Sequence, residues 1–323
     1  MAEVLEADHL RAYYTTGSKD IKAVDGVSFR VRKGEIFGIA GESGCGKTTL
    51  IKLLYAIARP PLRILQGDVF YEVGGKRIRA YSREMESLRW RFASYVPQGS
   101  MSALNPTSRI KKEFHDVMGA HMRDAEERER TAIEHLRSLD LPADVMERYP
   151  HQLSGGMKQR VTIALATVLR PDIIFADEPT TALDVVVQMV VISMLKEIQE
   201  EMKNTIVLVT HDMGVHAEMD DRIAVMYAGR IVEIASVYEI FGEPMHPYTN
   251  FLIKSLPRIG DKSGRASAPG TPPSLSALPE GCTFNPRCPY ARDVCRRETP
   301  ELMETSKEHW VSCFMAQGDE RWT

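Results

Sequence analysis

The chain has no apolar run long enough to cross a membrane as a helix. The longest run, residues 185–195, is interrupted by Gln188 and Ser193, whereas a bilayer requires about 20 residues. The first ten residues include three acidic side chains and no apolar core, so we do not expect a secretory signal peptide. The sequence therefore predicts a protein that is soluble, or that partners hold at a membrane.

Excess positive charge is also missing, and cysteine is scarce outside one segment. The 41 Lys and Arg residues against 44 Asp and Glu residues give a net charge of −3, so the chain lacks the basic surface typical of nucleic-acid binding. Four of the five cysteines lie between 282 and 313, in the segment after residue 281, which we call the tail. The 323 residues suffice for about two domains.

One stretch, residues 41–48, organises the remainder of the chain. Its sequence GESGCGKT fits the pattern G-x-x-x-x-G-K-[ST], after an apolar run at 35–40 and before helical spacing over 49–56. A strand, a Gly-rich turn and a helix indicate a phosphate-binding loop, although a chance Gly-rich turn is the alternative. We expect Lys47 to reach the β- and γ-phosphates of a nucleotide and Thr48 to hold Mg²⁺. The predicted nucleotide-binding residues here are Gly41, Ser43, Gly44, Cys45, Gly46, Lys47, Thr48 and Thr49.

Two strand patterns predict an α/β fold. Apolar and polar residues alternate over 27–32, the period of a half-exposed strand, and residues 69–71 before Gly74-Gly75 predict a hairpin. Continuous apolar runs at 173–176 and 206–209 are typical of parallel strands covered by helices. An antiparallel layer should therefore join a parallel sheet.

The sequence pattern changes at two places, which indicate a subdomain and a domain boundary. Helical patterns predict a helical subdomain inserted at about 100–165, inside a first domain spanning 1–240. Residues 257–281 contain five prolines and four glycines, which favours a linker or irregular wrap over a helix. We assign residues 241–323 to a second, C-terminal domain.

Polar side chains follow the buried strands. Asp177 is placed to bind Mg²⁺ or its water, and Glu178 to take a proton from an attacking water; a capped strand end is the alternative. Gln98 and His211 taken singly are more often structural. At the carboxyl edge of a parallel sheet that already carries a phosphate-binding loop, we expect them to be catalytic.

A second anion site is predicted at Ser154-Gly155-Gly156. Ser154 is a good N-cap for the helical pattern that follows, and the glycines leave the helix N-terminus bare to an anion. One nucleotide does not need two such helix ends, so we expect this one to serve the nucleotide of another subunit. The four residues alone would also fit an ordinary capped helix.

In this order, GESGCGKT, Gln98, LSGGMKQR, DIIFADEP, TALD and His211 resemble the ATP-binding subunit of ABC transporters over about residues 5–235. The resemblance implies the α/β fold of a P-loop ATPase of ABC type, and a head-to-tail dimer that encloses two ATP molecules. The resemblance implies that Glu178 is the general base, that His211 senses the γ-phosphate, and that Thr48, Gln98 and Asp177 hold Mg²⁺. It implies that Asp184 contacts the other subunit of the dimer, and that Tyr14, with Tyr13 as the competitor, stacks on adenine. The residues implied to face the opposite nucleotide are Ser154, Gly155, Gly156 and Gln159.

Two further segments narrow the resemblance. SALNP at 102–106 and HPYT at 246–249 look like the dipeptide/oligopeptide importer subfamily, which also includes subunits of nickel and oligosaccharide importers. This implies a place on the cytoplasmic face of the membrane, with two permeases, a second ATPase subunit that is a paralogue, and an extracytoplasmic substrate-binding protein. The substrate itself cannot be read from a chain that never touches it.

The sequence argues against two alternative functions from other classes of protein. A DNA-repair ATPase would place a very long coiled coil between Thr48 and Ser154, and only 105 residues separate them. A non-transport regulator that acts through its tail would not need intact Glu178 and His211.

The four tail cysteines form the spacing Cys282-x5-Cys288-x6-Cys295-x17-Cys313. Cytoplasmic thiols stay reduced, so a metal is expected. Zinc usually uses closer pairs, Cys₄ ligation also suits an iron–sulfur cluster, and free thiols are the third option. The subfamily resemblance favours a [4Fe–4S] cluster that staples a tail too small to fold alone.

Overall fold

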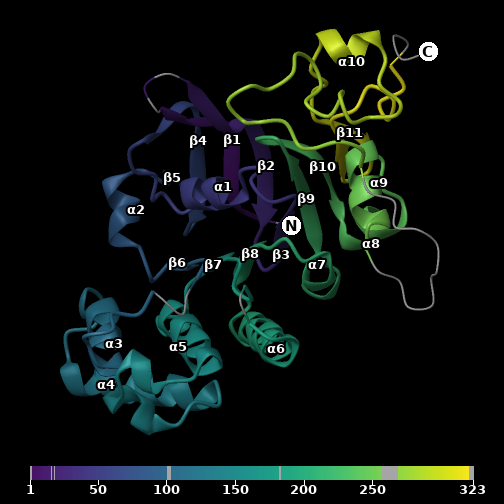
Figure 1. Ribbon diagram of the computed structural model, residues 1–323. Helices are drawn as coiled ribbons and strands as arrows, with labels where there is room; N and C mark the ends of the chain where they lie inside the picture. Colours follow the sequence, from purple (N-terminus) through teal and green to yellow (C-terminus); the bar gives the residue numbers. More distant parts are fainter. Residues whose placement is uncertain are drawn as a thin grey trace.

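Two β-sheets carry the fold, with a group of helices to one side (Figure 1). The computed structural model describes residues 2–15, 17, 19–99, 103–181, 183–256 and 268–319. Ser102 and most of the first half of the Pro-rich segment 257–281 lie outside the described residues. The described remainder, 268–281, contains no helix or strand, as its composition predicts.

The smaller sheet is antiparallel, as predicted. Its strand order is β2-β1-β4-β5, formed by β1 (Glu3–Thr15), β2 (Asp20–Arg32), β4 (Leu62–Val73) and β5 (Lys76–Arg79). The alternation over 27–32 buries Val27, Phe29 and Val31, because successive side chains of a strand point to opposite faces. The predicted hairpin at Gly74-Gly75 joins β4 to β5.

The larger sheet is mixed, with the order β11-β12-β10-β9-β3-β8-β7-β6. Its strands are β3 (Ile36–Ala40), β6 (Ala93–Val96), β7 (Ile173–Asp177), β8 (Thr205–Val209), β9 (Arg222–Tyr227), β10 (Arg230–Ser236), β11 (Met303–Ser306) and β12 (His309–Val311). From β9 to β6, neighbouring strands are parallel. The tail hairpin β11–β12 extends this sheet, since β12 pairs with β10, and no pattern in the sequence predicts that extension.

Alternate residues of the buried strands enter different cores. On β8, Val207 and Val209 face the core shared with the antiparallel sheet, whereas Ile206 and Leu208 face the helical side. Both faces of these strands are therefore covered, and this is why their sequences are apolar without interruption.

Helices cover both faces of the larger sheet. In chain order, the helices of the described residues are α1 (Lys47–Leu54), α2 (Arg83–Ser87), α3 (Ile110–Gly119), α4 (Ala125–Ser138), the 3₁₀ turns η2 (Ala143–Glu147) and η3 (Pro150–Gln152), α5 (Gly155–Thr167), α6 (Val185–Met202), α7 (Met213–Met219), α8 (Val237–Gly242), α9 (Pro247–Lys254) and α10 (Asp293–Arg297). In Figure 1, α3, α4 and α5 gather apart from the antiparallel sheet, and Phe114, Leu136 and Val161 share their core. Within the described ranges, no helix has the length and hydropathy to cross a membrane.

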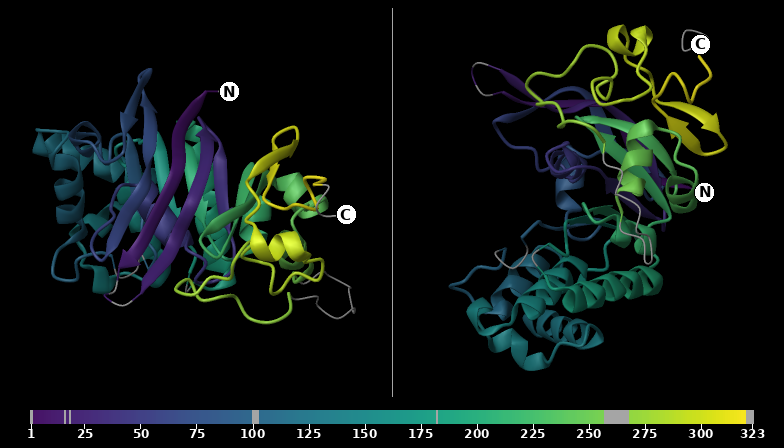
Figure 2. Two further views of the ribbon diagram at one scale, coloured as in Figure 1. Left: turned by 90° about the horizontal axis from the view of Figure 1, so that it is seen from above. Right: turned by 45° about the vertical axis from the view of Figure 1, so that its right-hand side comes forward.

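The tail folds back onto the sheet through a buried polar cluster. Figure 2 shows the tail beside β10 and α9. Buried Glu233 on β10 accepts hydrogen bonds from the backbone N–H groups of Met245 and His246, at 2.7 and 3.0 Å, and its Oε1 lies 2.7 Å from Nε2 of His309. His246 caps α9, since its Nδ1 accepts the Tyr248 N–H at 3.0 Å. Burial lowers the pKa of His246 to about 4, so this histidine is neutral.

Acid should therefore weaken the fold through His246. Its folded pKa of about 4 lies below the roughly 6.5 of an unfolded histidine, so the unfolded chain binds more protons between these pH values. Stability present above pH 6.5 should fall by about 1.4 kcal/mol per pH unit as the pH drops toward 4. His246→Asn retains a capping oxygen and should reduce that slope in urea unfolding at pH 7, 6 and 5. Equal slopes in parent and variant would contradict this assignment.

Candidate nucleotide-binding and catalytic site

The phosphate-binding loop connects β3 to α1 and is packed tightly on its neighbours. A Cβ at Gly41 would lie 2.2 Å from the Met226 carbonyl oxygen, and one at Gly46 would lie 2.1 Å from the Ala23 carbonyl oxygen. Gly46 also has φ +112°, in the region that favours glycine. Any side chain at either position would push the loop away from the two strands that support it.

Lys47 is folded back over the loop. Its Nζ donates to the carbonyl oxygens of Gly41 at 2.7 Å and Glu42 at 3.0 Å. Cys45 is buried, and burial raises the pKa of its thiol, so it is a small neutral side chain rather than a ligand. Ser43 and Gly44 are exposed at the tip of the loop.

Tyr14 and Tyr13 face different partners. The Tyr14 hydroxyl lies 3.1 Å from Oγ1 of Thr49 on α1, whereas the Tyr13 hydroxyl donates to Oδ1 of Asp25 at 2.7 Å. Tyr14 is therefore the tyrosine of the pair that contacts the phosphate-binding helix, and its stacking on adenine stays a prediction.

Asp177 ends β7 directly opposite Thr48. The Thr48 hydroxyl donates to Oδ1 of Asp177 at 3.2 Å, and the Tyr95 hydroxyl donates to Oδ2 at 2.9 Å. Burial raises the pKa of Asp177, although both hydrogen bonds oppose that effect. Thr48 and Asp177 present oxygen atoms of the kind that Mg²⁺ prefers, and a cation between them would favour the ionised carboxylate. Sequence reasoning missed Tyr95, which lies on β6 just before Gln98.

Glu178 is held by three side chains. Its Oε2 accepts from Nε2 of Gln98 at 3.0 Å and from the Thr181 hydroxyl at 2.7 Å, and its Oε1 lies 3.5 Å from Nδ1 of His211. Its backbone is left-handed, with φ 47°, and its N–H donates to the Val209 carbonyl at 2.8 Å. The backbone bond holds this unfavourable conformation and so aims the carboxylate. Thr181 is a second residue that sequence reasoning missed.

These side chains meet because four parallel strands end together. The strands β3, β8, β7 and β6 are consecutive in the sheet. Their carboxyl ends carry the phosphate-binding loop, His211, the pair Asp177-Glu178, and Gln98 respectively. The arrangement brings the Gly-rich loop, a carboxylate pair, a histidine and a glutamine to one edge of the sheet.

The predicted second anion site lies on the other face of the sheet from α1. Residues of α1 belong to the core shared with the antiparallel sheet, and residues of α5 to the helical core. Ser154 caps α5 by accepting the Met157 N–H at 3.2 Å, and it is exposed together with Gly155. The helix end is thus open to a molecule outside this chain.

Gln159 instead serves the interior, and Gly156 is half-exposed beside α6. Gln159 is 1% exposed and its amide donates to the Pro179 carbonyl, which ties α5 to the loop after Glu178. A Cβ at Gly156 would lie 3.0 Å from Cγ1 of Val187 on α6. Asp184 caps that helix by accepting the Val187 N–H at 3.0 Å and is exposed.

The four tail cysteines approach one another but do not form a single-ion site. All four are reduced; Cys295 and Cys313 are buried and the other two half-buried. Burial raises the pKa of Cys282 to about 12 and of Cys288 to about 11, and neighbouring cysteines add to both shifts. Across the described residues, no group of three or more His, Cys, Asp or Glu side chains is arranged to hold a metal ion. The predicted cluster is therefore not confirmed.

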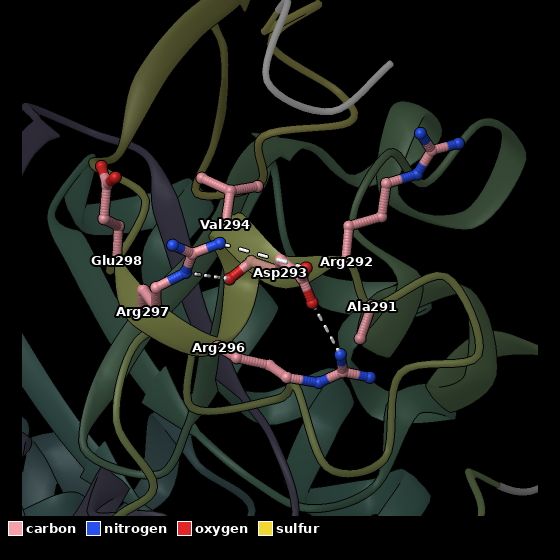
Figure 3. A pocket seen from close by; sticks show the side chains of 7 residues that line it. All are labelled: Ala291, Arg292, Asp293, Val294, Arg296, Arg297 and Glu298. Atoms are coloured by element: carbon pink, nitrogen blue, oxygen red, sulfur yellow. Dashed lines mark hydrogen bonds and ion pairs between the residues drawn. The ribbon is translucent and has the colours of Figure 1, made fainter.

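A cavity of about 610 Å³ lies on the tail, away from this edge (Figure 3). Arg296 and Arg297, which line it, pair with Asp293 of the same helix, α10. We assign no chemistry to it.

A Gly-rich loop between a strand and a helix, a carboxylate facing its threonine, and a second carboxylate held beside a glutamine and a histidine define a P-loop nucleotide hydrolase. Comparison with known proteins identifies the family within this class. The sequence profile described as "ABC transporter" matches residues 24–181, and the one described as "Oligopeptide/dipeptide transporter, C-terminal region" matches residues 232–295.

Whole-chain relatives agree. The chain is 41% identical to the dipeptide transport ATP-binding protein DppD of Caldanaerobacter subterraneus, covering 98% of both chains. It is 36% identical to the oligopeptide transport ATP-binding protein OppD of Bacillus subtilis, covering 99% of this chain and 90% of that one. A solved dimeric ATP-binding cassette with ADP and phosphate is 28% identical, with a TM-score of 0.63, over 72% of this chain and 98% of that one.

The chain belongs to the ABC transporter family, within its oligopeptide/dipeptide transport ATP-binding proteins. It has the α/β cassette fold of that family, with one antiparallel and one mixed sheet, and it is an ATPase.

Replacing Glu178 should separate hydrolysis from binding. A general base contributes typically about 10²–10⁴ in rate, so Glu178→Gln should lower ATP turnover by that factor and leave the dissociation constant for ATP near the parental value, because Lys47 and Asp177 remain. Glu201→Gln is a matched control, since Glu201 is exposed and pairs with Arg170 at 2.9 Å. Hydrolysis at the parental rate in Glu178→Gln would exclude this residue as the base.

Proposed function

We propose that this chain is the ATP-hydrolysing subunit of an importer for dipeptides or oligopeptides, working on partner permeases. The observation that carries the proposal is the near-complete match to proteins named for dipeptide and oligopeptide transport, which extends through the C-terminal region at 232–295. The same ATPase could serve a nickel or oligosaccharide importer, and the experiment below discriminates these substrates.

The geometry supports a division of work among the residues at the sheet edge. The loop N–H groups and Lys47 bind the phosphates, and Lys47 exchanges its present carbonyl partners for phosphate oxygens. Thr48, Asp177 and Gln98 would hold Mg²⁺, which screens the phosphate charge. Glu178 takes the proton of the attacking water, while His211 lies close enough to orient that water or contact the γ-phosphate.

The exposed end of α5 supports a head-to-tail dimer in which Ser154 and Gly155 meet the nucleotide of a second ATPase subunit, which we propose is a paralogue. Val185 and Val186, next to Asp184, are 74% and 72% exposed. Apolar side chains at such exposure favour a protein surface that covers them. The solved cassette with ADP and phosphate is itself dimeric.

In this assembly the chain lies against the cytoplasmic face of the membrane, beside two permeases that receive substrate from an extracytoplasmic binding protein. We divide it into an ATP-binding domain at 1–240, with the helical subdomain at about 100–165, and a C-terminal domain at 241–323. The pairing of β12 with β10 makes the second domain an extension of the first.

We further propose that the tail cysteines hold a [4Fe–4S] cluster. Around one zinc ion, four sulfurs would lie about 3.8 Å apart, and no described group is so arranged. Burial, and after it the charges of Cys295 and Cys313, raise the pKa values of Cys282 and Cys288, so the four thiols share one neighbourhood, and four cysteines are the ligand set of a [4Fe–4S] cluster. The metal would supply bonds that a tail this small needs for stability.

Reconstitution with permeases, a paralogous ATPase and a binding protein tests the transport assignment. Peptide-loaded binding protein should stimulate ATP turnover and drive peptide uptake into the vesicles. Ser154→Arg places bulk and charge at the α5 end and should abolish stimulated turnover, while this chain still binds ATP at its own loop. Stimulation by nickel or an oligosaccharide but not by peptides would overturn the substrate class.

Iron analysis tests the cluster. Prepared without air, the protein should be brown and contain about four irons per chain. Cys288→Ser should lower that content sharply, whereas Cys45→Ser, outside the tail, should not. Stoichiometric zinc without iron would replace the cluster by a zinc site, and four titratable thiols without metal would exclude both.

A further inference from the structure

Glu42, the second residue of the phosphate-binding loop, is held from three directions. Its backbone carbonyl accepts from Nζ of Lys47 at 3.0 Å, and its backbone N–H donates to the Tyr248 hydroxyl at 2.9 Å. Its carboxylate is paired with Arg287, at 3.0 Å from Nη1 to Oε2 and 3.2 Å from Nη2 to Oε1. Two of these three partners belong to the C-terminal region.

Arg287 is built into its place. Its side chain is 6% exposed, against 30% for that of Glu42, and its Nε donates to the Pro269 carbonyl at 2.9 Å. The guanidinium also lies 5.7 Å and 5.8 Å from the ring centroids of Tyr227 and Phe284. A two-bond fork between arginine and a carboxylate fixes orientation as well as charge. The pair thus holds the tail and the loop in one register.

Tyr248 belongs to the HPYT segment and reaches the same residue from α9. Its ring packs on Tyr227, with centroids 4.6 Å apart, and on Phe284 at 5.6 Å. His246 caps the helix that carries it. The Tyr248 hydroxyl therefore reaches the phosphate-binding loop from a packed aromatic cluster. The tail contributes Phe284 to that cluster.

The charge of Glu42 gives these contacts a consequence. A carboxylate in a loop that receives phosphates repels them, and water screens that repulsion only in part because the Glu42 side chain is 30% exposed. Arg287 is bonded to both carboxylate oxygens and cancels that charge. Its three guanidinium nitrogens already donate to Glu42 and to the Pro269 carbonyl, so in this arrangement it is not a phosphate ligand itself.

We propose that the C-terminal region is a positioning element for the phosphate-binding loop, in which Arg287 neutralises and orients Glu42 while Tyr248 holds its backbone. ATP affinity then depends on a folded tail, and by thermodynamic reciprocity ATP binding stabilises the tail. The inference requires that the loop binds ATP, as assigned above, but not that the transported substrate is a peptide.

Equilibrium ATP binding to the purified full-length chain tests the charge argument. Arg287→Gln leaves Glu42 unpaired and should raise the dissociation constant about tenfold, the scale of a charged hydrogen bond. Arg287→Lys retains the charge but not the fork and should fall between parent and Arg287→Gln. The double variant Glu42→Gln/Arg287→Gln removes the repulsion and should bind ATP better than Arg287→Gln alone.

Four further measurements separate positioning of the loop from loss of tail structure. The defect of Arg287→Gln should shrink as salt is raised, because salt screens the exposed carboxylate, and turnover at saturating ATP should change less than affinity. Hydrogen exchange at residues 282–288 should slow on adding ATP in the parent. Tyr248→Phe should speed exchange of the Glu42 amide, because the ring remains and the accepting hydroxyl is lost. The control Arg296→Gln removes an exposed tail pair with Asp293 and should leave ATP binding unchanged.

Parental affinity in Arg287→Gln would overturn the proposal. So would a double variant as weak as Arg287→Gln alone, because Arg287 would then act only by holding the tail together. If the parent chain binds no ATP, or if Lys47→Ala binds it equally well, the nucleotide site itself fails. Absence of peptide transport with these binding results intact would count against the transport assignment alone.

Discussion

The parallel pairing of β3, β8 and β7 is the constraint on which the rest of the molecule depends. Two register relations, Ile39 beside Val209 and Asp177 beside Val209, set the distance between the phosphate-binding loop and the carboxylate pair. The bond from Thr48 to Asp177 at 3.2 Å is possible only at that separation. A slip by one residue would turn each side chain to the other face of the sheet, and would separate the threonine from its carboxylate.

The residues at the sheet edge could be predicted because each strand and the polar residue after it are visible in a short stretch of sequence. Apolar runs of four residues reveal strands buried on both faces, and the polar residues that follow them must lie at one edge if the strands are parallel. The partners that hold these residues were not predictable in this way. Tyr95 and Thr181 reach Asp177 and Glu178 through side-chain directions that an alternation pattern does not specify.

The contacts of the tail and of Gln159 could not be predicted from local sequence, for a different reason. The pairing of β12 with β10 and the bond from Arg287 to Glu42 join residues far apart in the chain, and no periodicity in either segment encodes the other. Gln159 was assigned a role beside the opposite nucleotide, yet it is buried within its own chain. A helical pattern predicts a helix face, but which face turns inward depends on the partner that covers it.

The separation of 245 residues between Arg287 and Glu42 also orders events during synthesis. At roughly 5–20 residues per second, a ribosome needs about 10–50 s to progress from one to the other. Through that interval the loop of the nascent chain has neither its arginine nor the hydroxyl of Tyr248, which emerges only shortly earlier. A nascent chain that has not yet reached Arg287 therefore carries a complete phosphate-binding motif without its full set of supports, so the ATP site matures well after its own motif has been made.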